Sequence, residues 1–172
     1  LAVGGGLADA LARAFEACEQ VLVEAAVLGI ETTCAVLGNT DPSAPRQGLR
    51  ALPVVEIAPR GDRFFDHDQK YDPAGAEEFC PPRHLSPAVE ERIAALALLA
   101  HAELGCAGVS RVDFIVPRAG DVFGEPVMLE VNTLPGMTAR SLVPLSARAA
   151  GLGFADLLRE LCRLGAARRG AR

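Results

Sequence analysis

The chain has little of several features that mark particular classes of protein. It contains no tryptophan and one tyrosine, and only one of its 17 basic side chains, Lys70, is a lysine. No hydrophobic segment reaches the length of a membrane span, and the first residues lack the charged-then-apolar pattern of a secretory signal. The formal net charge of -5 disfavours a surface that binds nucleic acid. We therefore expect no membrane and no nucleic-acid partner.

The cysteines are also few and scattered. They show no CxxC spacing, no plausible metal partner lies near them, and their number is odd. We therefore expect reduced thiols in a cytoplasmic protein rather than a disulfide framework. The five are Cys18, Cys34, Cys80, Cys106 and Cys162.

What the chain does contain is a pattern of short helices and strands. Half of its 172 residues are hydrophobic, enough for one domain with its own core. Ser86 and Pro87 are typical of a helix start, and Gly105 of a helix end. The polar segment 60–85, interrupted by proline and glycine, predicts a long loop of the kind that forms lids. Apolar spacing predicts helices over 7–18, 86–105, 141–150 and 153–165, and strands over 20–25, 31–37, 52–57, 109–116 and 127–132.

The last two strands carry the most chemistry. If they form an antiparallel hairpin with its turn near 121–122, Asp113 faces Glu130 and Arg111 faces Asn132. Side chains alternate along a strand, so all four then lie on one face of the sheet. Two carboxylates and a carboxamide suit a hard cation such as magnesium, and the arginine suits a phosphoryl group. The alternative is a solvated face on which the arginine neutralises the acids.

The opposite face of this hairpin should belong to the core. It would present Val112 and Phe114 from one strand and Leu129 and Val131 from the other. An apolar face opposite a polar one is the ordinary pattern of a sheet that is covered on one side only.

Other candidate residues have weaker local signals. Glu24 and Glu31 read as surface carboxylates at strand ends, and Ser141 has neither a histidine base nor a nucleophile-elbow context. The glycines at 4–6 are not followed by a phosphate-loop motif and read as a flexible lead into the first helix. Lys70 is either a chemically required lysine or a plain surface residue.

Several segments resemble D-alanine–D-alanine ligases, a family of the ATP-grasp superfamily. LEVNTLPGMTARSL at 129–142 looks like the signature of these enzymes. RVDF at 111–114 and VLVE at 21–24 fit the same pattern at the right spacings. FFDHDQKY at 64–71 is similar to the family's mobile loop, and ALPVVEI at 51–57 to the strand before it.

This resemblance implies a fold for the whole chain. Residues 1–172 would form the C-terminal part of an ATP-grasp domain, of class α/β (α+β), with an antiparallel sheet flanked by helices and a lid loop at about 60–85. The family's N-terminal domain and its serine/glycine-rich phosphate loop have no counterpart in the sequence, and neither do two upstream lysines and the acid that orients the first substrate. We therefore expect a fragment whose activity is impaired when it is alone.

The resemblance also implies roles for residues of the hairpin. Asp113, Glu130 and Asn132 match the family's metal ligands, which hold Mg²⁺ or Mn²⁺, as two ions. Arg111 matches the arginine at the transferred phosphate. The metal assignment agrees with the chemistry expected from the strand face itself.

Further roles are implied for residues elsewhere in the chain. Lys70 and Tyr71 match the loop that closes over ATP and substrate. Gly136 would supply a backbone amide near the tetrahedral intermediate, and Ser141 would hold the carboxylate of the second D-alanine. The positions matching the nucleotide-binding residues are Glu24, Ala25, Val27 and Glu31, the last of them at the ribose.

The implied activity is ATP-dependent ligation of two D-alanines through an acyl phosphate, for peptidoglycan precursors. The implied partners are D-alanine, ATP, a second copy in a homodimer and a separately encoded N-terminal half. One alternative is a D-alanine–D-lactate ligase, which Lys70 and Tyr71 disfavour. Another is a nucleotide-binding remnant without catalysis.

Overall fold

The computed structural model describes residues 6–59 and 76–169. It contains four helices and seven strands in these ranges. They are α1 (Leu7–Ala17), β1 (Gly29–Asn39), β2 (Arg50–Ala51), β3 (Val55–Pro59), β4 (Ala76–Phe79), α2 (Pro87–Glu103), β5 (Ala107–Ala119), β6 (Val122–Phe123), β7 (Val127–Asn132), α3 (Leu142–Ala149) and α4 (Phe154–Arg169).

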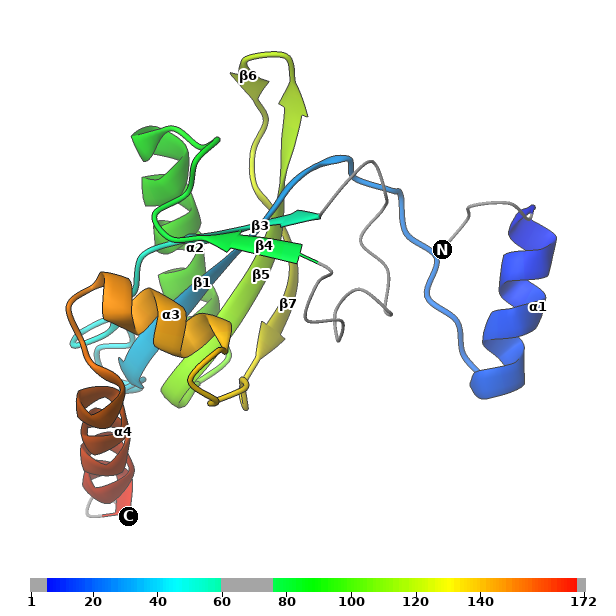
Figure 1. Cartoon of the computed structure of the whole chain (residues 1–172). Helices are drawn as coiled ribbons and strands as arrows, with labels where there is room; N and C mark the ends of the chain where they lie inside the picture. The colour runs from blue at the N-terminus through cyan, green and yellow to red at the C-terminus, as the bar shows by residue number, and fades with distance from the viewer. Residues whose placement is uncertain (1–5, 60–75, 170–172) are drawn as a thin grey trace.

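The strands form an antiparallel sheet with β1 and β5 at its centre (Figure 1). The order is β4-β3-β1-β5, while β6 and β7 both pair with β5, and β2 pairs with β1. Helix α2 packs against one face, and α3 and α4 against the other. The predicted antiparallel sheet flanked by helices is therefore confirmed.

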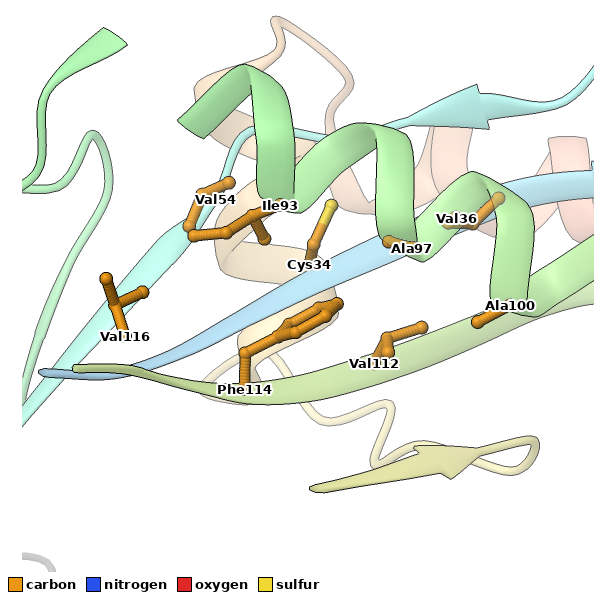
Figure 2. Close-up of a cluster of buried hydrophobic side chains, with 9 residues drawn as sticks. All are labelled: Cys34, Val36, Val54, Ile93, Ala97, Ala100, Val112, Phe114 and Val116. Carbon is orange, nitrogen blue, oxygen red and sulfur yellow. The ribbon is translucent and has the colours of Figure 1, made fainter. Parts of the chain in front are cut away.

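Alternation along β1 explains why the sheet has a helix on each side. Cys34 and Val36 point to α2, whereas Ala35 and Leu37 point to α3 and α4. Figure 2 shows the first cluster, in which Ile93 and Ala97 of α2 lie over side chains of β1 and β5. A strand buried on both faces reads as a continuous apolar run, and this is the sequence of β1 beyond Thr33.

The start of α2 follows the sequence signals. Ser86 is the N-cap, and its hydroxyl accepts a hydrogen bond from the backbone N–H of Val89 at 3.4 Å. Pro87 occupies the first helical position, where its missing N–H costs no hydrogen bond. The helix ends before Gly105, which has a φ of +61°, so the predicted helix is confirmed.

Two expectations about strands differ from the structure. Residues 20–28 form no strand, although they are rich in apolar and β-branched residues, because no strand of the described ranges pairs with them. Within the segment predicted as a loop, residues 76–79 form β4 and pair with β3 at the edge of the sheet. Of that predicted loop, 60–75 lies outside the described residues.

A buried carboxylate ties β3 to the segment that follows β4. Glu56 is 2% exposed, and its Oε2 accepts hydrogen bonds from the backbone N–H groups of Arg83 and His84, both at 2.9 Å. Its Oε1 lies 2.5 Å from Nδ1 of the His84 ring. Burial by itself raises the pKa of Glu56, but these hydrogen bonds outweigh it, so the pKa is held below its ordinary value.

All five cysteines are free thiols, as the sequence predicts. Among the described helices, none combines the length and the hydrophobicity that crossing a membrane requires.

Candidate functional site

The hairpin of β5 and β7 has the register that the sequence predicts. Asp113 pairs with Glu130 and Arg111 with Asn132. The tip of the hairpin lies at Gly120 and Asp121, one residue before the predicted turn, because Ala119 pairs with Val122. The connection after β6 and a β-bulge in β7 add residues to the second strand and so compensate for the earlier turn. Asp113 therefore still faces Glu130, and Arg111 still faces Asn132.

The bulge corrects one prediction. Because Asp113 pairs with Glu130 while Phe114 pairs with Met128, Leu129 is an extra residue in β7. The sequence pattern predicts that Leu129 belongs to the core, but the residue is 52% exposed, so that prediction is wrong. The reason is that β7 pairs only with β5 among the described strands, and the bulge there breaks the alternation that would turn Leu129 toward the core. Val112 and Phe114 are fully buried, as predicted.

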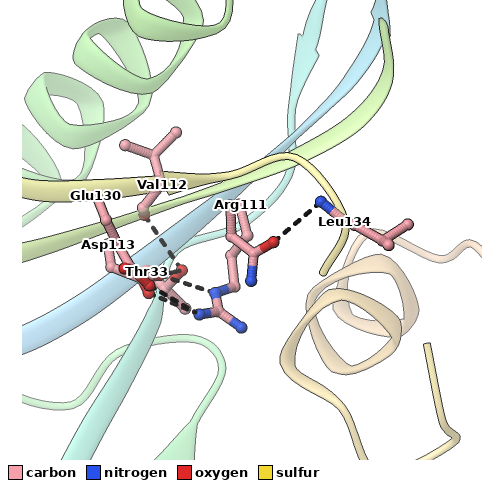
Figure 3. Close-up of polar contacts among 7 residues, drawn as sticks. Thr33, Arg111, Val112, Asp113, Glu130 and Leu134 are labelled. Atoms are coloured by element: carbon pink, nitrogen blue, oxygen red, sulfur yellow. Dashed lines mark hydrogen bonds and ion pairs between the residues drawn. The ribbon is translucent and has the colours of Figure 1, made fainter. Parts of the chain in front are cut away.

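Arg111 and Asp113, two residues apart on the same face of β5, form a two-point ion pair (Figure 3). Arg111 Nε donates to Asp113 Oδ1 at 2.8 Å and Nη2 donates to Oδ2 at 2.7 Å. The two side chains are only 13% and 12% exposed, respectively. Glu130 is more open at 57% exposed, and its Oε1 lies 3.8 Å from Arg111 Nη2.

The surrounding carboxylates keep the guanidinium charged. The hydrogen bonds to Asp113 raise the pKa of Arg111 above its ordinary value, against the opposing effect of burial. The negative charges of Asp113, Glu130 and Glu31 raise it further. The site therefore holds a permanent cation among three acids, and its net charge is negative.

Thr33 also belongs to this cluster, although no motif in the sequence marks it. It pairs with Asp113 across β1 and β5, and its Oγ1 lies 2.6 Å from Asp113 Oδ1. The available signal was its spacing of two residues from Glu31, which puts both side chains on the same face of β1. Nothing local in the sequence shows that Asp113 lies opposite, because the two residues are 80 positions apart.

The side chains of this face include oxygen donors of the kind that a hard divalent cation prefers. Within the described ranges, no group of three or more His, Cys, Asp and Glu side chains could hold a metal ion. Two carboxylates and the carboxamide of Asn132 do suit Mg²⁺, which binds through one or two carboxylates and keeps positions for water and phosphate oxygens. Asn132 Oδ1 accepts a hydrogen bond from the backbone N–H of Leu134 at 3.0 Å, which identifies the oxygen of its amide and holds it in place.

The loop after β7 brings Gly136 and Ser141 together. A Cβ atom at position 136 would lie 3.1 Å from Ser141 Oγ, so glycine leaves the space that this hydroxyl needs. Ser141 is the N-cap of α3 but does not cap it with its side chain. Its Oγ instead accepts from the backbone N–H of Thr138 at 3.0 Å and lies 2.9 Å from Thr138 Oγ1. When Thr138 Oγ1 donates, both acceptor sites of Ser141 are filled and its proton remains for an outside acceptor such as a carboxylate.

The predicted nucleotide-binding residues are divided between two environments. Glu31 lies on β1 with Thr33, on the same face as the ion pair. Glu24 and Ala25 are exposed and Val27 is half-buried, all in the irregular segment that leads into β1.

The structure does not bring this irregular segment into the cluster around Arg111. Lys70 and Tyr71 lie outside the described residues. The structure therefore brings together Glu31, the ion pair and Glu130 of β7, and leaves Glu24, Ala25 and Val27 in a separate segment.

Sequence comparison places this chain among ligases. The family model described as "D-ala D-ala ligase C-terminus" matches residues 5–163. The chain is 44% identical over 160 residues to a D-alanine--D-alanine ligase of Nitratidesulfovibrio vulgaris, covering 93% of this chain and 48% of the relative. It is 45% identical over 140 residues to D-alanine--D-alanine ligase B of Brucella suis, covering 81% and 42%. The chain thus spans about half the length of the curated relatives it matches.

The solved structures that this chain resembles are also ligases. The D-alanine--D-alanine ligase of Bacillus anthracis, complexed with ATP, aligns with a TM-score of 0.72 and 32% identity, covering 96% of this chain and 49% of that one. The VanG D-Ala:D-Ser ligase of Enterococcus faecalis aligns with a TM-score of 0.71 and 36% identity, covering 92% and 42%. The match of the family model to nearly the whole sequence identifies the chain as a member of the D-ala D-ala ligase C-terminus family.

Proposed function

We propose that this chain supplies the metal- and phosphate-binding part of an ATP-dependent D-alanine–D-alanine ligase that acts in the cytoplasm. The observation that carries the proposal is the register of β5 and β7, which gathers Arg111, Asp113, Glu130 and Asn132 on one sheet face. The Glu130 side chain is 57% exposed among the described residues, so its carboxylate is open to a ligand.

Each residue of the face has a chemical part in this proposal. Asp113, Glu130 and Asn132 would hold Mg²⁺ or Mn²⁺, as one or two ions, and the metal would neutralise the charge of the ATP phosphates. Arg111 is permanently charged and would stabilise the negative charge that develops on the transferred phosphoryl group. Glu31, on the same face, would contact the nucleotide.

The second substrate would meet the loop before α3. The Ser141 hydroxyl would donate to the carboxylate of the second D-alanine, and the Gly136 amide would face the tetrahedral intermediate. In the reaction, a carboxylate oxygen of the first D-alanine would take the γ-phosphoryl group of ATP and release ADP. The amine of the second D-alanine would then attack the acyl carbon, forming the peptide bond with loss of inorganic phosphate and a proton. Lys70 and Tyr71 would belong to a loop that shields the acyl phosphate from water.

A fused protein tests this function directly. The N-terminal half of the Nitratidesulfovibrio vulgaris relative, joined to residues 1–172, supplies the part that this chain does not match. We expect the fused protein to form D-alanyl-D-alanine from ATP, Mg²⁺ and D-alanine, detected by mass spectrometry, and we expect residues 1–172 alone to form little or none. Several groups acting on one transition state each contribute about 100-fold or more, so losing them together abolishes most of the rate.

The same assay separates the competing functions. D-lactate and D-serine, offered as second substrates, would reveal a different ligase specificity. A fused protein that folds and binds ATP but forms none of the three products would instead support a nucleotide-binding protein without ligase activity.

A further inference from the structure

Thr33 sits where it can control the orientation of Asp113. It is 2% exposed, and its Oγ1 lies 2.6 Å from Asp113 Oδ1 and 3.2 Å from the backbone oxygen of Val112. A hydroxyl has one proton to donate, and the shorter contact to a charged oxygen is the stronger of the two. The proton therefore goes to the carboxylate.

The hydrogen bonds of Asp113 leave one direction open. Among the described residues, its Oδ1 accepts from Thr33 Oγ1 and from Arg111 Nε, while its Oδ2 accepts from Arg111 Nη2 alone. A carboxylate oxygen has about two lone pairs, so Oδ1 is filled and Oδ2 keeps one. With these three contacts in place, the carboxylate can offer only Oδ2 to a further ligand.

We propose that Thr33 is a positioning residue for the cation site: its hydroxyl occupies Asp113 Oδ1 and thereby fixes Oδ2 as the oxygen that faces the metal. This inference rests on the proposed metal site, in which Asp113 is one of the ligands. Without the Thr33 hydroxyl, Arg111 alone would hold the carboxylate. Asp113 Oδ1 would then be free to compete for the cation, and the geometry around the metal would loosen.

The neighbouring residue Thr32 provides a matched comparison. It is also a buried threonine of β1, but it points to the opposite face, and its hydroxyl has no hydrogen-bond partner in the described part of the chain. Replacing Thr32 with valine therefore removes a buried hydroxyl from the same strand without touching Asp113. A general effect of replacing a buried threonine of β1 would therefore appear in Thr32→Val as well as in Thr33→Val.

The test measures the affinity of the chain of residues 1–172 for Mn²⁺, by electron paramagnetic resonance of the free ion. Losing a partner that orients a metal ligand costs about 10- to 100-fold in affinity. We expect Thr33→Val to weaken Mn²⁺ binding about 10-fold, Thr33→Ser to restore it and Thr32→Val to leave it unchanged. In an Asp113→Asn background, Thr33→Val should add no further loss, because Thr33 acts through Asp113. Circular dichroism checks that each variant is folded, and Thr33→Ala removes the same hydroxyl should the valine variant not fold.

The outcomes distinguish this inference from the proposed function. In one outcome, the unsubstituted chain binds Mn²⁺ tightly and the Thr33→Val and Thr33→Ala variants bind it equally well. That result would overturn the role of Thr33 and leave the metal site intact. A loss that Thr33→Ser does not restore, or one that persists in the Asp113→Asn background, would also overturn it. An unsubstituted chain that binds no Mn²⁺ would overturn the metal site itself, and the role of Thr33 with it.

Discussion

The buried carboxylate of Glu56 gives a prediction whose size follows from its contacts. Glu56→Ala leaves the backbone N–H groups of Arg83 and His84 without their acceptor. Hydrogen bonds to a charged group contribute about 1.5–3 kcal/mol each. The His84 side chain is 54% exposed, so water can reach part of the segment and replace some of this loss. We therefore expect Glu56→Ala to lower the free energy of unfolding by about 2–4 kcal/mol.

The same group predicts how stability depends on pH. The pKa of Glu56 is lower in the folded protein than its ordinary value of 4.5. A carboxyl group with a lowered folded pKa stabilises the protein above its unfolded pKa, and this contribution is lost as the pH falls through the folded value. The contribution of Glu56 should therefore be complete at neutral pH, begin to decline near pH 4.5 and be lost as the pH falls further, through the lower folded pKa. Glu56→Gln, which cannot ionise, should lose this part of the acid sensitivity.

Urea unfolding between pH 3 and pH 7, followed by circular dichroism, measures both effects. Glu78→Ala is the matched control, because Glu78 lies on the neighbouring strand β4 and is exposed. Its substitution should change the free energy of unfolding by no more than about 0.5 kcal/mol. Equal stability of the Glu56→Ala and Glu78→Ala variants, or an unchanged acid profile in Glu56→Gln, would refute the reasoning.

Three further predictions concern the site, a thiol and a glycine. Arg111→Met leaves the buried carboxylate of Asp113 with its hydrogen bond from Thr33 but without its cation, so the free energy of unfolding at pH 7 should fall by about 2–4 kcal/mol, measured by urea unfolding. A stability equal to that of the unsubstituted chain would contradict the ion pair. Burial raises the pKa of Cys34 to about 12, so this thiol should react with a thiol reagent at pH 8 far more slowly than the exposed cysteines. Gly29→Ala would press a Cβ atom against the backbone oxygen of Val116 and should lower the melting temperature by several degrees.

Local sequence pattern was sufficient for the hairpin that carries the site. Alternation of polar and apolar residues in β5 and β7 predicted that Asp113 and Glu130 share a face, because a slip by one residue would bury the polar set. Their direct pairing followed only from the turn assumed at 121–122, since a slip by two residues keeps the same face. The same reasoning failed at Leu129, where a bulge interrupts the alternation. A bulge at a sheet edge leaves no clear mark in a sequence.

What the sequence did not reveal depends on partners far along the chain. Residues 20–28 have strand-like composition but no strand beside them, whereas residues 76–79 look polar and yet pair with β3. Thr33 meets Asp113 across 80 positions, and Glu56 meets His84 across 28. Such contacts become visible only once the order of strands in the sheet is known.

The most direct test of the proposed cation site is the affinity of the fused protein for ATP in the presence of Mg²⁺, measured by isothermal titration calorimetry. Glu130→Gln removes one negative charge from the open side of the site, while Glu125→Gln removes a charge from an exposed pair with Arg92 just before β7. We predict that Glu130→Gln weakens Mg²⁺-dependent ATP binding about 10-fold or more and that Glu125→Gln leaves it unchanged. An affinity in the Glu130→Gln protein equal to that of the unsubstituted protein would contradict the account.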